Sequence, residues 1–194
     1  VDGEVRDSLA LAESTEQSAW DWIDGRLSAQ KLATTGDVDM PYTLDEAPSY
    51  GAFTRLSAET AALGGWFGLA AEALNEVVEA HRASAVTPPE VRCWPHHFDI
   101  AALFVLDEGD PETARSVGVG LSPGDGSYAE PYLYASPWPA PVADALPVLD
   151  LPLRWHTEGF VSVVVAVSDL ASAEGLGAAG RAAAGAAFAE LLAR

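Results

Sequence analysis

Apolar residues recur every three or four positions in the first part of the chain, which is the period of an amphipathic helix. We expect a first helix over residues 4–33, where the repeat comprises Val5, Leu9, Ala12, Ala19, Trp22, Ile23 and Leu27. Residues 36–51 follow with prolines, glycines and many acidic side chains, and this composition predicts a long loop.

A second helix is predicted to begin near Ser57, a residue type favoured at helix N-caps, with Glu59 in its first turn. His81 falls in the last turn, where a cation interacts favourably with the helix dipole. The prolines after Thr87 end the helix. Its apolar face comprises Leu63, Trp66, Phe67, Ala70, Leu74, Val77 and Val78.

The pattern then changes to short runs of β-branched and aromatic residues separated by turn sequences. Four strands are expected, within residues 91–107, 116–122, 130–136 and 159–169. The connections are too short for crossover helices, so the strands should form an antiparallel sheet.

An alanine-rich tail over residues 171–192 predicts a C-terminal helix that covers one face of the sheet. Helices followed by strands and a final helix indicate an α+β fold. We expect one domain over residues 1–194, with a mainly helical part (1–87), a sheet part (88–170) and the C-terminal helix (171–194).

The chain has 194 residues and a formal charge of −19, from 29 acidic and 10 basic residues. Such a charge repels phosphate backbones and anionic lipid headgroups, so we expect neither nucleic acid nor a membrane surface as a partner. Solubility, or adaptation to acid or salt, is the simplest explanation of the acidity.

Cys93 is the single cysteine, so no intrachain disulfide can form, in agreement with a reducing cytoplasm. We expect it to be buried and unreactive. No apolar run reaches the roughly 18 residues of a membrane span. The chain begins without Met, and its first residues lack the basic segment and apolar run of a signal peptide.

Residues 120–124, GLSPG, match the G-x-S-x-G motif of a hydrolase nucleophile. The motif needs a helix after the serine and an oxyanion-hole N–H on the next residue. That residue is Pro123, which has no N–H. A tight turn that closes a strand is therefore the better interpretation, and Asp125 with Gly126 suits such a turn.

The segment WPHHFDI, residues 94–100, holds two of the four histidines. On a strand, His97 and Asp99 would point to the same face. With His156 as a third ligand they would form a 2-His-1-carboxylate site for Zn or Fe. Iron oxygenases that use 2-oxoglutarate usually place a basic residue after the distal histidine, and residues 157–170 contain none.

Two other interpretations of these residues need no metal. Asp99 could accept hydrogen bonds from His97 or from loop N–H groups in a purely structural role. Alternatively the segment lines a polar small-molecule pocket with aromatic walls. Ligand-binding candidates for the pocket are His96, Asp125, Trp94, Trp138 and Trp155, and Tyr128, Tyr132 and Tyr134 flank the same polar segments.

Residues 91–101, 118–139 and 154–160 resemble a family of uncharacterised bacterial proteins with the signature WPHHFD, SPGD-x-SY-x-EPY and WHT-x-G. The resemblance covers residues 88–161 closely and the preceding helix loosely. Family members extend further at the N-terminus, which implies that this chain is short or trimmed. More remotely, F-D-[LI]-A followed by Y-x-Y-x-x-P-x-P is similar to another bacterial domain of unknown function. Neither resemblance implies an activity or a cofactor.

We therefore expect a cytoplasmic protein that binds a neutral or cationic small molecule in a His-, Asp- and Trp-lined pocket. One alternative is a metal-dependent hydrolase or oxygenase, in which burial would raise the pKa of Glu130 and make it a general base. A second alternative is a structural or interaction protein that pairs with another copy of itself through a sheet face or edge.

Overall fold

The structure is a computed structural model that describes residues 7–33, 52–53, 57–95, 97–110, 113–172 and 175–193. Contacts within the chain group it into two compact units, residues 1–61 and residues 62–194, and each unit is described by itself. The single domain over residues 1–194 stays a prediction. The loop expected at residues 36–51 lies outside the described residues.

Helix α1 (Glu16–Ala29) belongs to the first unit and is shorter than predicted. Thr15 and Ser18 cap it reciprocally, because each side chain accepts a hydrogen bond from the backbone N–H of the other. Such a capping box fixes where a helix begins. The helical prediction is therefore wrong for residues 7–15, and no residue of α1 is buried.

Helix α2 (Ser57–His81) confirms the second predicted helix, and the side chain of Ser57 lies outside the described part. A short 3-10 turn, η1 (Arg82–Ser84), follows before the prolines. The apolar residues of the second half of α2 are buried: Ala70, Ala73, Leu74, Val77 and Val78.

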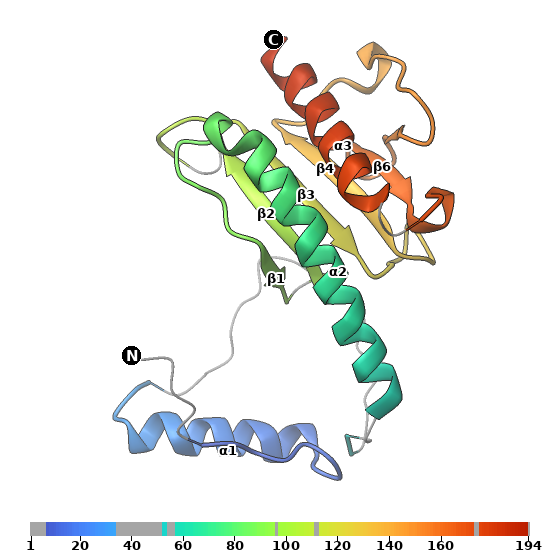
Figure 1. The fold of residues 1–194 in the computed structure, drawn as a ribbon. Helices are drawn as coiled ribbons and strands as arrows, with labels where there is room; N and C mark the ends of the chain where they lie inside the picture. The colour runs from blue at the N-terminus through green and yellow to red at the C-terminus, as the bar shows by residue number, and fades with distance from the viewer. Residues whose placement is uncertain are drawn as a thin grey trace. The chain divides into compact units, whose positions relative to one another are not determined.

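The described residues form one antiparallel sheet of six strands in the order β1-β2-β3-β4-β6-β5 (Figure 1). The strands are β1 (Arg92–Trp94), β2 (Asp99–Val105), β3 (Ser116–Ser122), β4 (Tyr132–Trp138), β5 (Arg154–His156) and β6 (Ser162–Ala166). The α+β class is confirmed, with six strands in place of four.

Two local features account for the extra strands. The predicted strand over residues 91–107 is a hairpin, because the chain turns at Pro95 and pairs Trp94 with Asp99. The other addition is β5, which lies between a proline-rich segment and β6 and pairs with β6. Its three residues are too few to show an alternating pattern.

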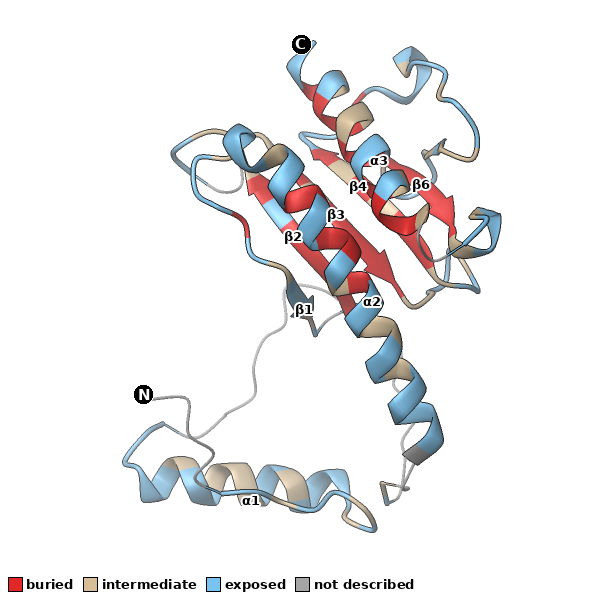
Figure 2. Ribbon diagram, viewed as in Figure 1, coloured by how far each residue is buried: buried red, intermediate tan, exposed pale blue. Residues whose placement is uncertain are grey.

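Helices α2 and α3 (Gly175–Leu192) cover the same face of the sheet (Figure 1), and buried residues lie along the strands and on both helices (Figure 2). The C-terminal helix is confirmed, although it begins later than residue 171. Its small residues allow close packing: a Cβ on Gly180 would lie 2.9 Å from Val77 Cγ2.

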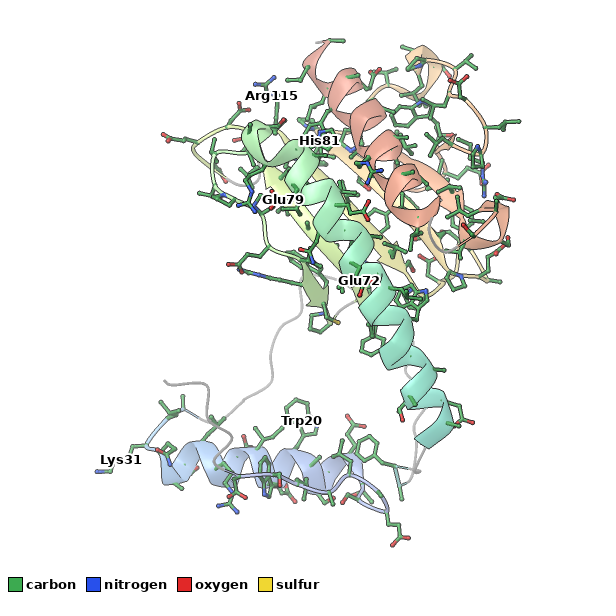
Figure 3. All side chains as sticks on the ribbon, in the orientation of Figure 1. Trp20, Lys31, Glu72, Glu79, His81 and Arg115 are labelled. Atoms are coloured by element: carbon green, nitrogen blue, oxygen red, sulfur yellow. The ribbon has the colours of Figure 1, made fainter. Side chains whose placement is uncertain are left out.

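His81 ends α2, as predicted (Figure 3), but its surroundings are aromatic. Its ring stacks on Phe188 of α3, with 4.8 Å between the centroids, and meets Phe104 edge-on. Burial lowers the pKa of His81, and a hydrogen bond to the backbone of Arg181 opposes that effect only in part. Burial at this position therefore opposes the cation that the helix dipole would favour, and the role of the dipole stays a prediction.

Candidate functional site

The two faces of the sheet differ because β3 alternates valine and glycine at its centre. Val117, Val119 and Leu121 are fully buried in the core beneath the helices. Gly118 and Gly120 alternate with them, and successive residues of a strand point to opposite faces. The face away from the helices therefore has a strip without side chains.

A cavity of about 300 Å³ lies on this second face. Its lining comes from the turn before β2, from β2, β3 and β4, and from the loops that follow β3 and β5. The lining residues are His97, Asp99, Ser122, Asp125, Tyr132, Tyr134, Ser136 and Phe160.

Two tyrosine–aspartate pairs organise the cavity. The hydroxyl of Tyr134 donates to Oδ2 of Asp99, and the hydroxyl of Tyr132 donates to Oδ2 of Asp125 over 2.6 Å. Both tyrosines lie on β4, two positions apart, and therefore share a face. Asp99 is only 5% exposed, whereas Asp125 is exposed.

Asp125 also organises the loop that follows β3. Its Oδ1 accepts hydrogen bonds from the N–H groups of Ser127, over 2.8 Å, and Tyr128, over 3.1 Å. Gly124 adopts a φ of +116°, a backbone conformation that is strained for any residue with a side chain. The prediction that the strand closes at GLSPG is confirmed, because β3 ends at Ser122, but a loop over residues 123–131 follows in place of a tight turn.

The electrostatics of the cavity favour an ionised Asp125. Partial burial raises its pKa, but the hydrogen bonds from Tyr132, Ser127 and Tyr128 and the charge of His97 outweigh burial and lower the pKa overall. Burial and the nearby carboxylates raise the pKa of Tyr132 and of Tyr134. Both phenols therefore stay protonated and serve as donors at neutral pH.

Gly120 is the residue that lets Tyr134 reach Asp99. The two residues lie opposite each other on β3 and β4. A Cβ at position 120 would lie 2.5 Å from both Cζ and Oη of Tyr134, and 2.8 Å from Cβ of Ala101. The phenol ring therefore occupies the space that a side chain at position 120 would fill.

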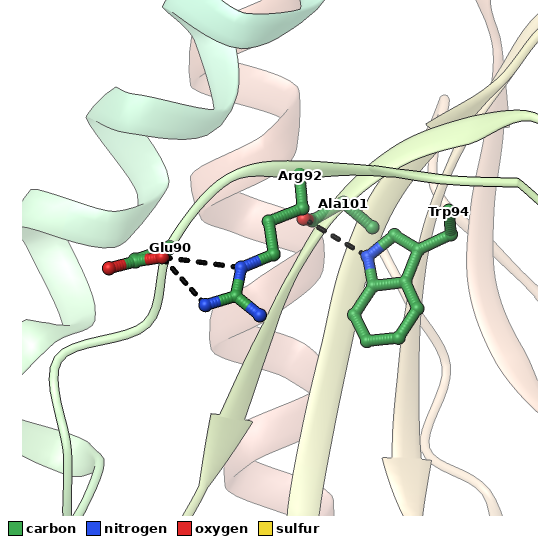
Figure 4. Close-up of polar contacts among 4 residues, drawn as sticks. All are labelled: Glu90, Arg92, Trp94 and Ala101. Carbon is green, nitrogen blue, oxygen red and sulfur yellow. Dashed lines mark hydrogen bonds and ion pairs between the residues drawn. The ribbon is translucent and has the colours of Figure 1, made fainter. Parts of the chain in front are cut away.

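A second cavity, of about 240 Å³, shares His97, Asp99 and Tyr134 with the first. The indole N–H of Trp94 donates to the carbonyl oxygen of Ala101 over 3.3 Å (Figure 4), so the ring is held against β2. The remaining lining residues are Trp94, Ala101, Ala102, Leu103 and Gly118.

His97 and Asp99 line the same cavities, but they do not lie on one strand as predicted. His97 is in the turn between β1 and β2, and Asp99 is the first residue of β2. The turn brings Phe98 to a φ of +54°, and the N–H of Phe98 donates to the carbonyl oxygen of Trp94. His96 lies outside the described residues.

His156 is held by other partners. Its Nδ1 lies 2.8 Å from the hydroxyl of Tyr128, its Nε2 lies 2.7 Å from the carbonyl oxygen of Glu158, and its ring stacks on Phe160. Within the described ranges, no group of three or more His, Cys, Asp and Glu side chains could hold a metal ion. The described residues thus do not fit the predicted Zn or Fe triad of His97, Asp99 and His156.

The other predicted residues are dispersed. Trp155 packs against the core on the helix-covered side, and its indole N–H donates to the carbonyl oxygen of Pro147. Trp138 and Glu130 are exposed and are not among the lining residues of either cavity. Cys93 is also exposed, so the prediction of a buried thiol is wrong.

Sequence reasoning missed Ser122, Ser136 and Phe160 as lining residues. Ser122 and Ser136 occupy the strand positions that alternate with core residues, and this alternation is a usable signal. The hydroxyl of Ser136 is hydrogen-bonded to that of Ser162, which is fully buried. Phe160 follows β5 in a loop, and no pattern in the sequence marks it.

Comparisons of the chain with protein-family models, with curated proteins and with solved structures gave no significant match. None of the helices in the described part of the chain is both long enough and apolar enough to cross a bilayer.

Proposed function

We propose that the protein binds a small organic cation, an amine or a quaternary ammonium group, in the cavity lined by Asp99 and Asp125. The observation that carries the proposal is the pair of tyrosine–aspartate hydrogen bonds. These bonds commit the two phenol donors to the carboxylates. The cavity therefore offers a ligand mainly acceptor oxygens and aromatic surface.

The charge of the lining supports a cation over an anion. Asp125 stays ionised because its hydrogen bonds lower its pKa. Among the described lining residues, His97 is the only basic side chain, and its charge acts on Asp125. The formal charge of −19 also attracts cations toward the molecule as a whole.

The shape and the walls of the cavity support a small ligand. A volume of about 300 Å³ is at the lower end of small-molecule sites. Phe160, Tyr132 and Tyr134 present aromatic rings, and a ring within about 6 Å attracts a cation electrostatically. Aromatic rings bind quaternary ammonium groups in other proteins by this attraction.

The proposal is tested by NMR titration with tetramethylammonium chloride, with neutral tert-butanol as a shape-matched control. We expect saturable binding of the cation only, weakened by added salt. Asp125→Asn is nearly isosteric and keeps one acceptor oxygen for the loop but removes the charge. It should weaken binding roughly 10- to 150-fold, since a hydrogen bond or contact to a charged group contributes roughly 1.5–3 kcal/mol.

Glu72→Gln is the matched control, because it makes the same change in net charge on α2 (Figure 3), and α2 packs on the face of the sheet opposite the cavity. It should leave the affinity within about twofold, as expected for a distant, screened charge. Equal binding of cation and alcohol, or an equal loss in both variants, would refute the proposed site.

A further inference from the structure

The second cavity adjoins the first at the hydrogen bond between Tyr134 and Asp99. Both residues line both cavities, as does His97. A ligand held by the carboxylates of the first cavity would therefore lie next to the entrance of the second. The chemistry of the second cavity therefore indicates which group the ligand has beside its cationic group.

The second cavity is mainly apolar apart from the three shared residues. The indole N–H of Trp94 donates to the carbonyl oxygen of Ala101 (Figure 4), and Trp94 lines the cavity, so its ring is the part that a ligand can contact. Leu103 lines the cavity and is 42% exposed although it lies within the sheet. An apolar group placed there would remove both side chains from water.

Gly118 is the reason that this second cavity is open. It pairs with Leu103 on one side and with Ser136 on the other, and directly opposed residues point to the same face. A Cβ at Gly118 would meet no atom within 4 Å, whereas the same addition at Gly120 would collide with Tyr134. The space above Gly120 is therefore filled by Tyr134, whereas the space above Gly118 is open.

We infer that the ligand of this site is an amphiphilic amine, whose cationic group lies at Asp99 and Asp125 and whose apolar group enters the cavity formed by Trp94, Leu103 and Gly118. The inference rests on the proposed function and specifies its ligand class. Aryl- and alkylamines meet the requirement, whereas compact polar cations leave the second cavity empty.

The test compares the dissociation constants of methylamine and 2-phenylethylamine by NMR titration of the full chain. Each buried methylene group strengthens binding by about fourfold, so 2-phenylethylamine should bind at least about tenfold more tightly. The indole N–H resonance of Trp94, assigned by its loss in Trp94→Phe, should shift with 2-phenylethylamine and not with methylamine.

Gly118→Leu fills the second cavity and should reduce the ratio of the two affinities to below about threefold. Gly118→Ala fills it in part and should give an intermediate ratio, which also guards against loss of the fold in the larger variant. Gly185→Leu is the matched control, because it makes the same change where a Cβ also meets no atom, on α3 across the sheet. It should keep the wild-type ratio.

The outcomes separate the two proposals. If methylamine binds but the ratio in the wild type is near one, or if Gly118→Leu keeps the wild-type ratio, the inference is wrong and the proposed function stands. If neither amine binds, both are wrong. Equal binding of 2-phenylethylamine and neutral 2-phenylethanol would show an apolar site and would also overturn both.

Discussion

Gly120→Ala should damage the candidate site more than any other addition of a single methyl group to β3. The new Cβ would lie 2.5 Å from Cζ and Oη of Tyr134 and 2.8 Å from Cβ of Ala101. Non-bonded carbon atoms prefer about 3.5–4.0 Å. The phenol ring must therefore move by about 1 Å or more, and it then no longer donates to Asp99.

The cost has two parts. Forcing a methyl group into a packed position destabilises a protein by about 1–3 kcal/mol. Removing the donor of a buried acceptor adds about 1–3 kcal/mol, and Asp99 is only 5% exposed. Alanine recovers about 0.5–1 kcal/mol relative to glycine in a strand. We expect a net loss of about 1–5 kcal/mol, centred near 3 kcal/mol, in the free energy of unfolding.

Urea denaturation followed by tryptophan fluorescence measures this loss. Gly118→Ala is the matched control, because it lies two residues away on the same face and its Cβ meets no atom within 4 Å. It should leave the free energy of unfolding unchanged or raise it by up to about 1 kcal/mol. Equal stabilities of the two variants would refute the packing of Tyr134 over Gly120.

Two further predictions concern the rest of the second unit. The pKa of His81 is lowered by burial, so the unfolded chain binds more protons, and stability should fall as the pH drops below the unfolded value of about 6.5. His81→Gln should reduce the pH dependence of the unfolding free energy measured between pH 5 and 7.5, and an unchanged slope would contradict the burial of His81. Cys93 is exposed on the edge strand β1, so Ellman's reagent should modify it fully without denaturant. A thiol that reacts only in urea would contradict that exposure.

The fold could be predicted where local patterns decide the structure. The stretch over residues 116–122 became β3 because its β-branched residues alternate with small ones, and its end at Pro123 follows from turn chemistry. The hairpin at Pro95 could not be predicted in the same way. Trp94 and Asp99 pair across a turn in which Phe98 has a φ of +54°. Steric clashes disfavour this conformation for a bulky residue, so the sequence does not predict a turn there.

The candidate site depends on strand register, which local patterns do not encode. Asp99 meets Tyr134 only because β2, β3 and β4 are neighbours and Gly120 lies between the two side chains. The sequence did indicate that His97 and Asp99 belong together, although a turn brings them to the cavity. His156 was assigned as a ligand because no sequence pattern shows that Tyr128, 28 residues away, contacts its ring.

The two glycines at the centre of β3, Gly118 and Gly120, differ in whether the packing of the fold explains them. Glycine in a strand interior is unfavourable by about 0.5–1 kcal/mol relative to alanine. At position 120 the packing of Tyr134 explains it, because any larger residue displaces the ring. At position 118 no described side chain needs the space, so alanine should be tolerated or stabilising. A glycine at a position where the unliganded fold does not need one is what a bound apolar group would require. An increase in stability together with a reduced aryl selectivity in Gly118→Ala would show both effects at one position.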